Sequence, residues 1–210
     1  MSTKIFWDID TQKDFMKKDG ALYVPGAEEI IPTLQKITRY AKDKDFPILG
    51  SVDAHQVKDQ EFKQNGGPFP AHCIKGTEGQ RKIAELQLEN PIFIPNVEYQ
   101  EIMAVDKKVE EHLSSKGEVF FEKQSFDVFN NPHLDRVLAR LNVKQAVLYG
   151  VTTDFCVRAA AFGMADRDIE VYVVEDAIKP VNPKDGVRAK ERMREEGITF
   201  RKWKEIETAS

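Results

Sequence analysis

The chain has 210 residues, of which 41% are hydrophobic and 31% charged, and its formal net charge at pH 7 is −4. This length and composition suit a single α/β domain with one sizeable core, which we place at residues 1–210. Lysine and arginine are interleaved with acids instead of forming a basic stripe, so the sequence argues against nucleic acid as a partner. No apolar run opens the chain and no span of about 18 apolar residues occurs, which predicts a cytoplasmic protein without membrane contact.

Strand and helix patterns alternate from the start of the chain. An apolar run predicts a first strand at 4–10, and apolar residues at helical spacing predict a helix at 27–43. A second strand is expected at 46–52. The polar, glycine-containing stretch 54–79 follows as a loop, and loops of that length inside compact domains are usually functional or disordered.

The second half of the chain continues this alternation. Further strands are expected at 91–95, 118–123, 146–149, 170–175 and 198–200, and further helices at 104–114, 132–141 and 183–195. Strands that alternate with helices favour a mainly parallel sheet with helices on both faces. The sequence therefore predicts a three-layer α/β/α fold around a sheet of roughly six strands.

The stretch 145–164 places a cysteine between a strand and a helix. Its apolar start predicts a strand and its alanine-rich end a helix, while Gly150 and Asp154 suit a tight turn and a helix start. Cys156 is therefore expected in the first helical turn, where unpaired N–H groups favour thiolate over thiol. The competing interpretation is a buried structural cysteine. We expect Cys156 and the other cysteine, Cys73, to be free thiols.

Four polar residues fall at the carboxyl ends of different predicted strands, or just beyond them: Asp10, Asp53, Lys123 and Cys156. Parallel open sheets bind ligands at that edge, which favours a catalytic role for Cys156. In this interpretation Asp10 is the general base that takes the thiol proton, and the Lys123 ammonium stabilises the thiolate. His112 and His133 are expected to be solvated beside surface helices, so a Cys-His dyad is poorly supported.

The loop after Asp53 contains a second candidate site. Asp53 and His55 are spaced i and i+2, so both can face one ion if the backbone is extended, and His72 can return from the far end of the loop. One carboxylate and two imidazoles suit zinc, iron(II) or manganese, with positions left for water or a substrate atom. Glu61 is a candidate for an additional ligand. The alternative is that these polar side chains are simply solvated.

These motifs, in this order, resemble those of the cysteine hydrolases of the isochorismatase-like superfamily, and within it the nicotinamidase family. The matching segments are Asp10-Thr-Gln-Lys-Asp14-Phe15, Gly20 to Ala27, Asp53-Ala-His55, His72 to Gly79, Lys123 after its apolar strand, and Gly150 to Arg158. They cover most of the chain. Each segment is moderately specific alone, and their shared order and spacing make the resemblance strongly specific.

The resemblance implies a catalytic triad of Asp10, Lys123 and Cys156. It also implies a cis peptide bond between Val151 and Thr152, which would let the Thr152 N–H join that of Cys156 in an oxyanion hole. Val151 is then expected beside the substrate.

For the loop, which we place at about residues 53–79, the resemblance implies one divalent metal held by Asp53, His55 and His72. We expect zinc, with iron and manganese as alternatives, and Glu61 as an additional ligand. Phe15 and Phe69 are the candidates to sandwich an aromatic substrate ring.

The implied activity is hydrolysis of nicotinamide to nicotinate and ammonia through a cysteine thioester, a step of NAD salvage. The partner would be a small aromatic amide, and assembly into a homo-oligomer is left open. Two alternatives remain. A metal-independent relative acting on another small amide or on isochorismate would keep the triad without using the histidine loop, and a scaffold protein on this fold would have an inert Cys156.

Overall fold

The computed structural model describes residues 3–97 and 102–209. Within them, seven strands form one sheet in the order β3-β4-β2-β1-β5-β6-β7, and each neighbouring pair is parallel. The strands are β1 (Thr3–Ile9), β2 (Ile48–Asp53), β3 (Ile92–Ile94), β4 (Val119–Lys123), β5 (Val143–Val151), β6 (Glu170–Lys179) and β7 (Thr199–Arg201). The predicted fold is confirmed. The sheet exceeds the expected size of roughly six strands because short runs at both edges, β3 and β7, pair with longer neighbours.

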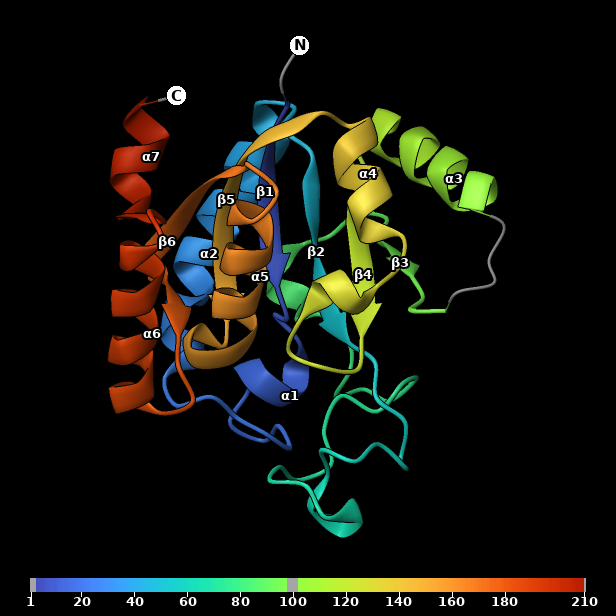
Figure 1. Cartoon of the computed structure of the whole chain (residues 1–210), viewed down its shortest axis with the longest axis vertical. Coiled ribbons are helices and arrows are strands. Elements are labelled where there is room, and N and C mark those ends of the chain that lie inside the picture. Colours follow the sequence, from blue (N-terminus) through green and yellow to red (C-terminus); the bar gives the residue numbers. More distant parts are fainter. Residues whose placement is uncertain (1–2, 98–101, 210) are drawn as a thin grey trace.

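Helices cover both faces of this sheet (Figure 1). The α-helices are α1 (Lys13–Met16), α2 (Ala27–Asp43), α3 (Ile102–Ser114), α4 (Leu134–Arg140), α5 (Arg158–Ala165), α6 (Pro183–Glu195) and α7 (Trp203–Ala209). Short 3-10 turns occur at Lys63–Asn65, Ala84–Leu86 and Val128–Asn130, and a π-helical turn occurs at Thr153–Val157. None of the helices within the described ranges combines the length and the apolar character needed to cross a lipid bilayer.

Two helices match their predicted bounds residue for residue because local signals fix their starts. α2 follows Gly26, whose φ of 75° is a left-handed conformation that glycine adopts without penalty. α6 follows Asn182, whose side chain accepts a hydrogen bond from the Lys184 N–H, and Pro183 is its first residue.

Each face of the sheet has its own apolar core. We call one side the α5 face: α3, α4, α5 and α6 cover it and contribute buried residues such as Val109, Val137, Ala161 and Met193. The other side is the α2 face, covered by α1, α2 and α7 with buried residues such as Phe15, Leu34 and Trp203. In Figure 1, α4 and α5 lie in front of the sheet and α2 lies behind it.

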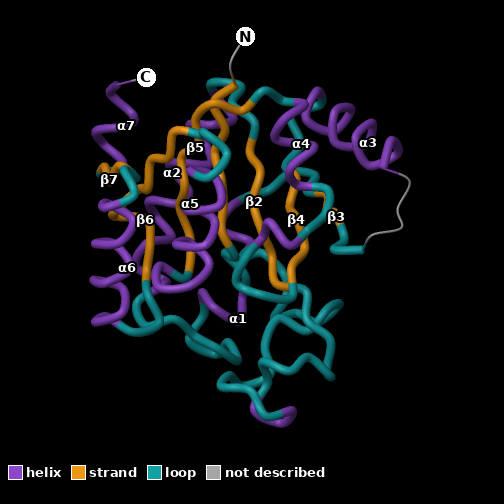
Figure 2. Tube along the Cα trace, in the orientation of Figure 1, coloured by secondary structure: helices purple, strands orange, loops and turns teal. Residues whose placement is uncertain are grey.

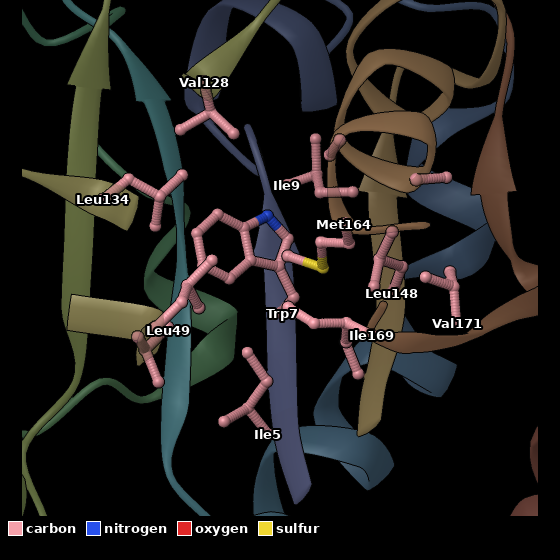
Figure 3. Packing of buried hydrophobic residues seen from close by; sticks show 14 of the residues in the cluster. Ile5, Trp7, Ile9, Leu49, Val128, Leu134, Leu148, Met164, Ile169 and Val171 are labelled. Atoms are coloured by element: carbon pink, nitrogen blue, oxygen red, sulfur yellow. The ribbon is translucent and has the colours of Figure 1, made fainter. Parts of the chain in front are cut away.

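Trp7 of β1 lies at the centre of the α5-face core. It is fully buried, and its indole stacks on Phe121 with ring centroids 6.1 Å apart and an interplanar angle of 12°. Figure 3 shows the side chains that surround it, among them Ile5, Ile9, Leu49, Leu148 and Met164. Side chains alternate along a strand, so Ile5, Trp7 and Ile9 share this face whereas Phe6 points to the α2 face.

Several details differ from the sequence-based expectations. Cys156 lies in the π-helical turn, and α5 begins only at Arg158. α7 was not predicted, because its only buried residues are Trp203 and Ile206. This single i,i+3 pair is too short a pattern to indicate a helix. His133 is buried instead of solvated, since it lies where α4 begins and its Nε2 is 3.2 Å from the Val97 carbonyl.

The order of the chain reverses beside β1. β2 pairs with one side of β1, and β5 returns to pair with the other. In open parallel sheets, ligands bind at the carboxyl ends of the strands next to such a switch point. Figure 2 shows loops gathered below the strands at that edge.

Trp7→Ala should destabilise the protein by about 3–5 kcal/mol, because removing a buried aromatic ring leaves a cavity. The free energy of unfolding would be measured by chemical denaturation followed by circular dichroism. Val187→Ala, at a position that is 52% exposed, is the control and should change that energy by less than about 0.5 kcal/mol. Similar small effects of the two substitutions would show that the α5-face core does not depend on Trp7.

Candidate active site

Neighbouring strand ends bring the four predicted polar residues together. Asp53 and Lys123 are the last residues of β2 and β4, and they pair in register. Asp10 directly follows β1, and Cys156 lies in the turn after β5. All four residues are at most 5% exposed. The carboxyl edge of the sheet therefore holds a buried group of two acids, a lysine and a thiol.

The Lys123 ammonium lies at the centre of this group. Its Nζ is 2.9 Å from Asp10 Oδ2, donates to Cys156 Sγ at 3.4 Å, and forms a close ion pair with Asp53. Burial works against the charge of Lys123, but the two carboxylates hold its pKa well above the ordinary value. Lys123 is therefore a cation shared by the two acids and the thiol.

Asp10 reaches Lys123 through a left-handed backbone conformation. Strand alternation alone would place its side chain on the α2 face, with Phe6. Its φ of 47° turns the side chain to the α5 face, where Ser51 Oγ donates to Asp10 Oδ1 at 2.7 Å. Aspartate adopts this conformation more readily than most residues. The backbone at Asp10 thus decides which face of the sheet carries the acid.

The turn of Cys156 does not by itself stabilise a thiolate. Burial raises the pKa of the Cys156 thiol well above its ordinary value, and the Lys123 charge opposes this effect only in part. The negative charges of Asp10 and Asp53 also raise this pKa. Desolvation is the largest influence on this pKa, so the thiol keeps its proton until a base takes it. Asp10, which contacts the same Lys123 ammonium as the thiol, is the candidate base.

The Gln12 side chain fixes the end of β2 relative to the end of β1. Its Oε1 accepts from the Asp53 N–H at 2.7 Å, and its Nε2 donates to the Asp53 carbonyl at 2.8 Å. Nε2 also donates to the Gln80 carbonyl at 2.7 Å. The amide pairs with the Asp53 backbone as another strand would, so the position of Asp53 depends on the segment that carries Asp10.

Asp53 also borders a cluster of histidines from the following loop. Its Oδ2 is 3.7 Å from Nε2 of both His55 and His72, and one ligand atom from each of the three residues lies within 4.8 Å of the others. Glu61 Oε1 is 3.4 Å from His55 Nε2 and 3.3 Å from His72 Nε2. Four ligand atoms bound at about 2.1 Å around a tetrahedral ion stand roughly 3.4 Å apart. The four distances of 3.3 to 3.7 Å fit such an ion.

Both histidines are held with Nε2 directed at Asp53. His55 Nδ1 bonds to Asp59 Oδ2 and His72 Nδ1 bonds to the Pro70 carbonyl, each at 2.9 Å. Such partners place the hydrogen on Nδ1 and leave Nε2 free to bind a metal. Among the described residues, the buried His55 Nε2 has no hydrogen-bond partner. A buried nitrogen without a partner is costly, and a bound cation would satisfy it.

Asp14 anchors the returning end of the loop that carries the two histidines. Its Oδ2 accepts from the Cys73 N–H at 2.7 Å, next to His72, and its Oδ1 accepts from the Ala21 N–H at 3.0 Å. Gly79 packs so closely on this carboxylate that a Cβ there would lie 2.2 Å from Asp14 Oδ2. The segment after β1 therefore holds both ends of the histidine cluster in place.

Aromatic rings surround the histidines and the nucleophile. Phe15 and Phe69 both lie beside His72, with ring centroids 5.3 and 6.2 Å away. Phe155, which directly precedes the nucleophile, lies 5.8 Å from Phe69 and 4.8 Å from Phe126 between centroids. Phe126 is 40% exposed. The rings form a partly open apolar border between the metal cluster and the thiol.

The turn that carries the nucleophile begins with a cis peptide bond between Val151 and Thr152, as the resemblance implied. Val151 is buried in the α2-face core, and Thr152 is 4% exposed. Asp154 accepts from the N–H groups of Val181 and Asn182 at 3.0 and 2.9 Å. These bonds tie the turn to the residues that start α6.

Sequence reasoning missed several residues of this site. Phe126 and Phe155 gave no signal, because a single phenylalanine after a strand or in a turn is typical of an apolar core. Asp59 was also missed, although an acid four residues after His55 could have suggested a partner for that ring.

Comparison with known proteins agrees with this geometry. A family model described as the Isochorismatase domain matches residues 103–205. An isochorismatase family protein, PncA, of Bacillus subtilis strain 168 is 28% identical over 178 residues, covering 83% of this chain and 85% of that protein. The nicotinamidase of Escherichia coli K12 is 24% identical over 214 residues, with 91% of both chains covered.

A solved structure shows the same fold. The crystal structure of the pyrazinamidase of Pyrococcus horikoshii in complex with zinc superimposes with a TM-score of 0.76 at 28% identity, covering 95% of this chain and 98% of that one. These similarities support an isochorismatase-like superfamily protein that is most like the nicotinamidases.

Proposed function

We propose that this protein hydrolyses nicotinamide to nicotinate and ammonia, breaking a linear amide C–N bond. The observation that carries the proposal is the position of Lys123, which contacts Asp10, Cys156 and the same Asp53 that borders the histidine cluster. A nucleophile, a proton carrier and a fixed cation are the groups that covalent amide hydrolysis requires. The similarity to the nicotinamidase of Escherichia coli supports the choice of substrate.

Asp53, His55 and His72 are proposed to hold one divalent metal, with Glu61 as an additional ligand. Nitrogen and oxygen ligands at these spacings suit zinc, and iron or manganese would accept the same set. The zinc complex of the related pyrazinamidase supports zinc. When bound, the metal would offer a coordination position to the pyridine nitrogen of the substrate.

The substrate ring is proposed to pack against the phenylalanines around His72. Phe15 and Phe69 flank this histidine, and Phe155 and Phe126 extend the apolar border toward the nucleophile. Aromatic side chains bind a flat ring at little cost in conformational freedom. Contact with them would align the carboxamide carbon with the thiol, which converts binding energy into orientation.

Acylation begins at the Cys156 thiol. Because burial raises its pKa, the thiol needs a base, and Asp10, which contacts the same Lys123 ammonium as the thiol, is proposed to be that base. Asp10 takes the proton while the Lys123 ammonium, 3.4 Å from the sulfur, stabilises the attacking thiolate. The carbon–sulfur bond forms at the carboxamide carbon, and the negative charge moves to the carboxamide oxygen.

The backbone N–H groups of Thr152 and Cys156 are proposed to receive this oxyanion. Asp10 then passes its proton to the departing nitrogen, the C–N bond breaks, ammonia leaves and a thioester remains. A water molecule that loses a proton to Asp10 attacks the thioester. The tetrahedral adduct that forms then collapses and releases nicotinate. Asp10 returns the proton to the sulfur, which restores the thiol.

The remaining expectations from the sequence belong to the same proposal. They are a single domain over residues 1–210, in which the stretch 53–79 is the metal loop, and assembly into a homo-oligomer as an open option. Val151 is proposed to act through the backbone geometry of its turn, because its side chain is buried in the α2-face core.

Cys156→Ala should abolish ammonia release from nicotinamide, with a fall in kcat on the order of 10⁴-fold or more, the scale for losing a catalytic nucleophile. A coupled ammonia assay measures this, and a thermal unfolding midpoint close to that of the wild type would show that the variant is folded. Ammonia release retained by Cys156→Ala would exclude the thioester mechanism. A wild-type protein that hydrolyses no nicotinamide with zinc, iron or manganese would exclude this substrate.

His72→Ala should weaken zinc binding by at least about 100-fold, since losing even an outer hydrogen-bond partner of a ligand costs 10- to 100-fold. Zinc per chain would be measured by mass spectrometry after dialysis at a fixed free zinc concentration. His112→Ala, on α3 and outside the cluster, is the matched control and should keep the wild-type content. Equal zinc in the two variants would contradict the proposed ligand set.

A further inference from the structure

A buried ion pair that the mechanism does not use lies near the carboxyl end of β1. Asp8 is 1% exposed, and Lys82 Nζ is 3.1 Å from its Oδ1. The Lys82 side chain is 5% exposed, and its Nζ lies 4.3 Å from the centroid of the Phe120 ring. Because strand side chains alternate, Asp8 and Phe6 share the α2 face, opposite the nucleophile.

Such a pair is costly to bury in this place. Moving two charges out of water costs several kcal/mol per ion, and well-packed apolar side chains of similar volume are often at least as stable. Burial raises the pKa of Asp8 and lowers that of Lys82, so the surroundings work against both charges. The pair is therefore better suited to fixing a local geometry than to adding stability.

The pair is linked to the residue that follows Asp10. Thr11 Oγ1 donates to both carboxylate oxygens of Asp8, at 2.8 and 3.0 Å, and accepts from Lys82 Nζ at 3.1 Å. Asp8, Thr11 and Lys82 thus form a closed hydrogen-bonded group, which we call the clamp. Asp10 lies between Asp8 and Thr11 in the sequence and has the left-handed φ of 47°.

The segment that carries Lys82 is fastened on both sides of Gln12. The Lys13 N–H donates to the Arg81 carbonyl at 2.9 Å, and the Ile83 N–H donates to the Thr11 carbonyl at 3.0 Å. Gln12 and Lys82 form an antiparallel bridge between these bonds. Lys82 therefore cannot shift independently of the turn at Asp10.

We propose that the clamp is a positioning unit that holds the Asp10 carboxylate against Lys123 and Cys156. With the side chains of residues 8 and 11 fastened together on the α2 face, the chain between them is confined to the turn that sends the Asp10 side chain to the α5 face. This inference rests on the proposed role of Asp10 as the base. Asp8, Thr11 and Lys82 touch no reacting atom and act through Asp10.

The double variant Asp8→Val/Lys82→Met tests the clamp, because it removes both charges and leaves neither one buried alone. Its thermal unfolding midpoint should stay close to that of the wild type. Its kcat for ammonia release should fall about 10- to 100-fold with KM nearly unchanged, because a displacement on the order of 1 Å in a catalytic group costs up to about 10²-fold. Lys17→Gln, which breaks an ion pair with Glu85 further along the same two segments, is the control and should keep the wild-type kcat.

Thr11 provides a second test that does not depend on folding of the double variant. Thr11→Val keeps the shape but removes the hydroxyl, and should lower kcat by about tenfold, the effect of roughly 1.4 kcal/mol in the barrier. Thr11→Ser restores the hydroxyl and should restore most of kcat. A wild-type kcat in Thr11→Val would overturn the proposal, as would an unchanged kcat in a folded double variant.

A crystal structure of the double variant separates this inference from the proposed function. The clamp predicts that Asp10 leaves the left-handed region and loses its hydrogen bond from Ser51. An Asp10 that keeps both features would overturn the inference even if nicotinamide is hydrolysed. A wild-type protein without activity on nicotinamide would reject the proposed function. The position of Asp10 in the variant would still test the inference about the clamp.

Discussion

The burial of the Lys123 charge is the constraint on which the rest of the site depends. An ammonium removed from water needs partners of opposite charge, and Asp10 and Asp53 supply them from the ends of two neighbouring strands. Asp53 in turn borders both metal-loop histidines. One lysine therefore links the Cys156 thiol to the histidine cluster, and a change in either carboxylate is expected to alter both. This sharing explains why the site needs a buried, rigid sheet edge instead of mobile surface loops.

The backbone around β1 supplies that rigidity. Its neighbours approach so closely that a Cβ at Gly150, where φ is 119°, would lie 2.1 Å from the Ile9 carbonyl. Gln12 and Asp14 then bind the β2 end and the returning loop, so the segment after β1 organises the acid, the metal ligands and Phe15 together. The contacts of Gly150, Gln12 and Asp14 therefore fix both the packing of the strands and the positions of the site residues.

The sequence was sufficient for the fold and for the residues that gather at the sheet edge, because strand ends and helix starts are encoded locally. It could not predict which face Asp10 uses, since strand alternation indicates the α2 face and only the left-handed φ reverses it. The sequence also could not predict properties that depend on tertiary burial. The raised pKa of Cys156 and the burial of His133 both depend on packing from distant segments. Lys82, in a polar loop, gave no sign of its pairing with Asp8.

The most direct test of the account compares two properties of one preparation before and after chelation: hydrolysis of nicotinamide and alkylation of Cys156 by iodoacetamide. The account predicts that hydrolysis disappears with the metal and returns when zinc is restored, while Cys156 is still alkylated in the metal-free protein. In the proposed mechanism, the triad carries the chemistry and the metal cluster holds the substrate against it. Full hydrolysis of nicotinamide by protein shown to contain no metal would contradict this division and favour a metal-independent hydrolase.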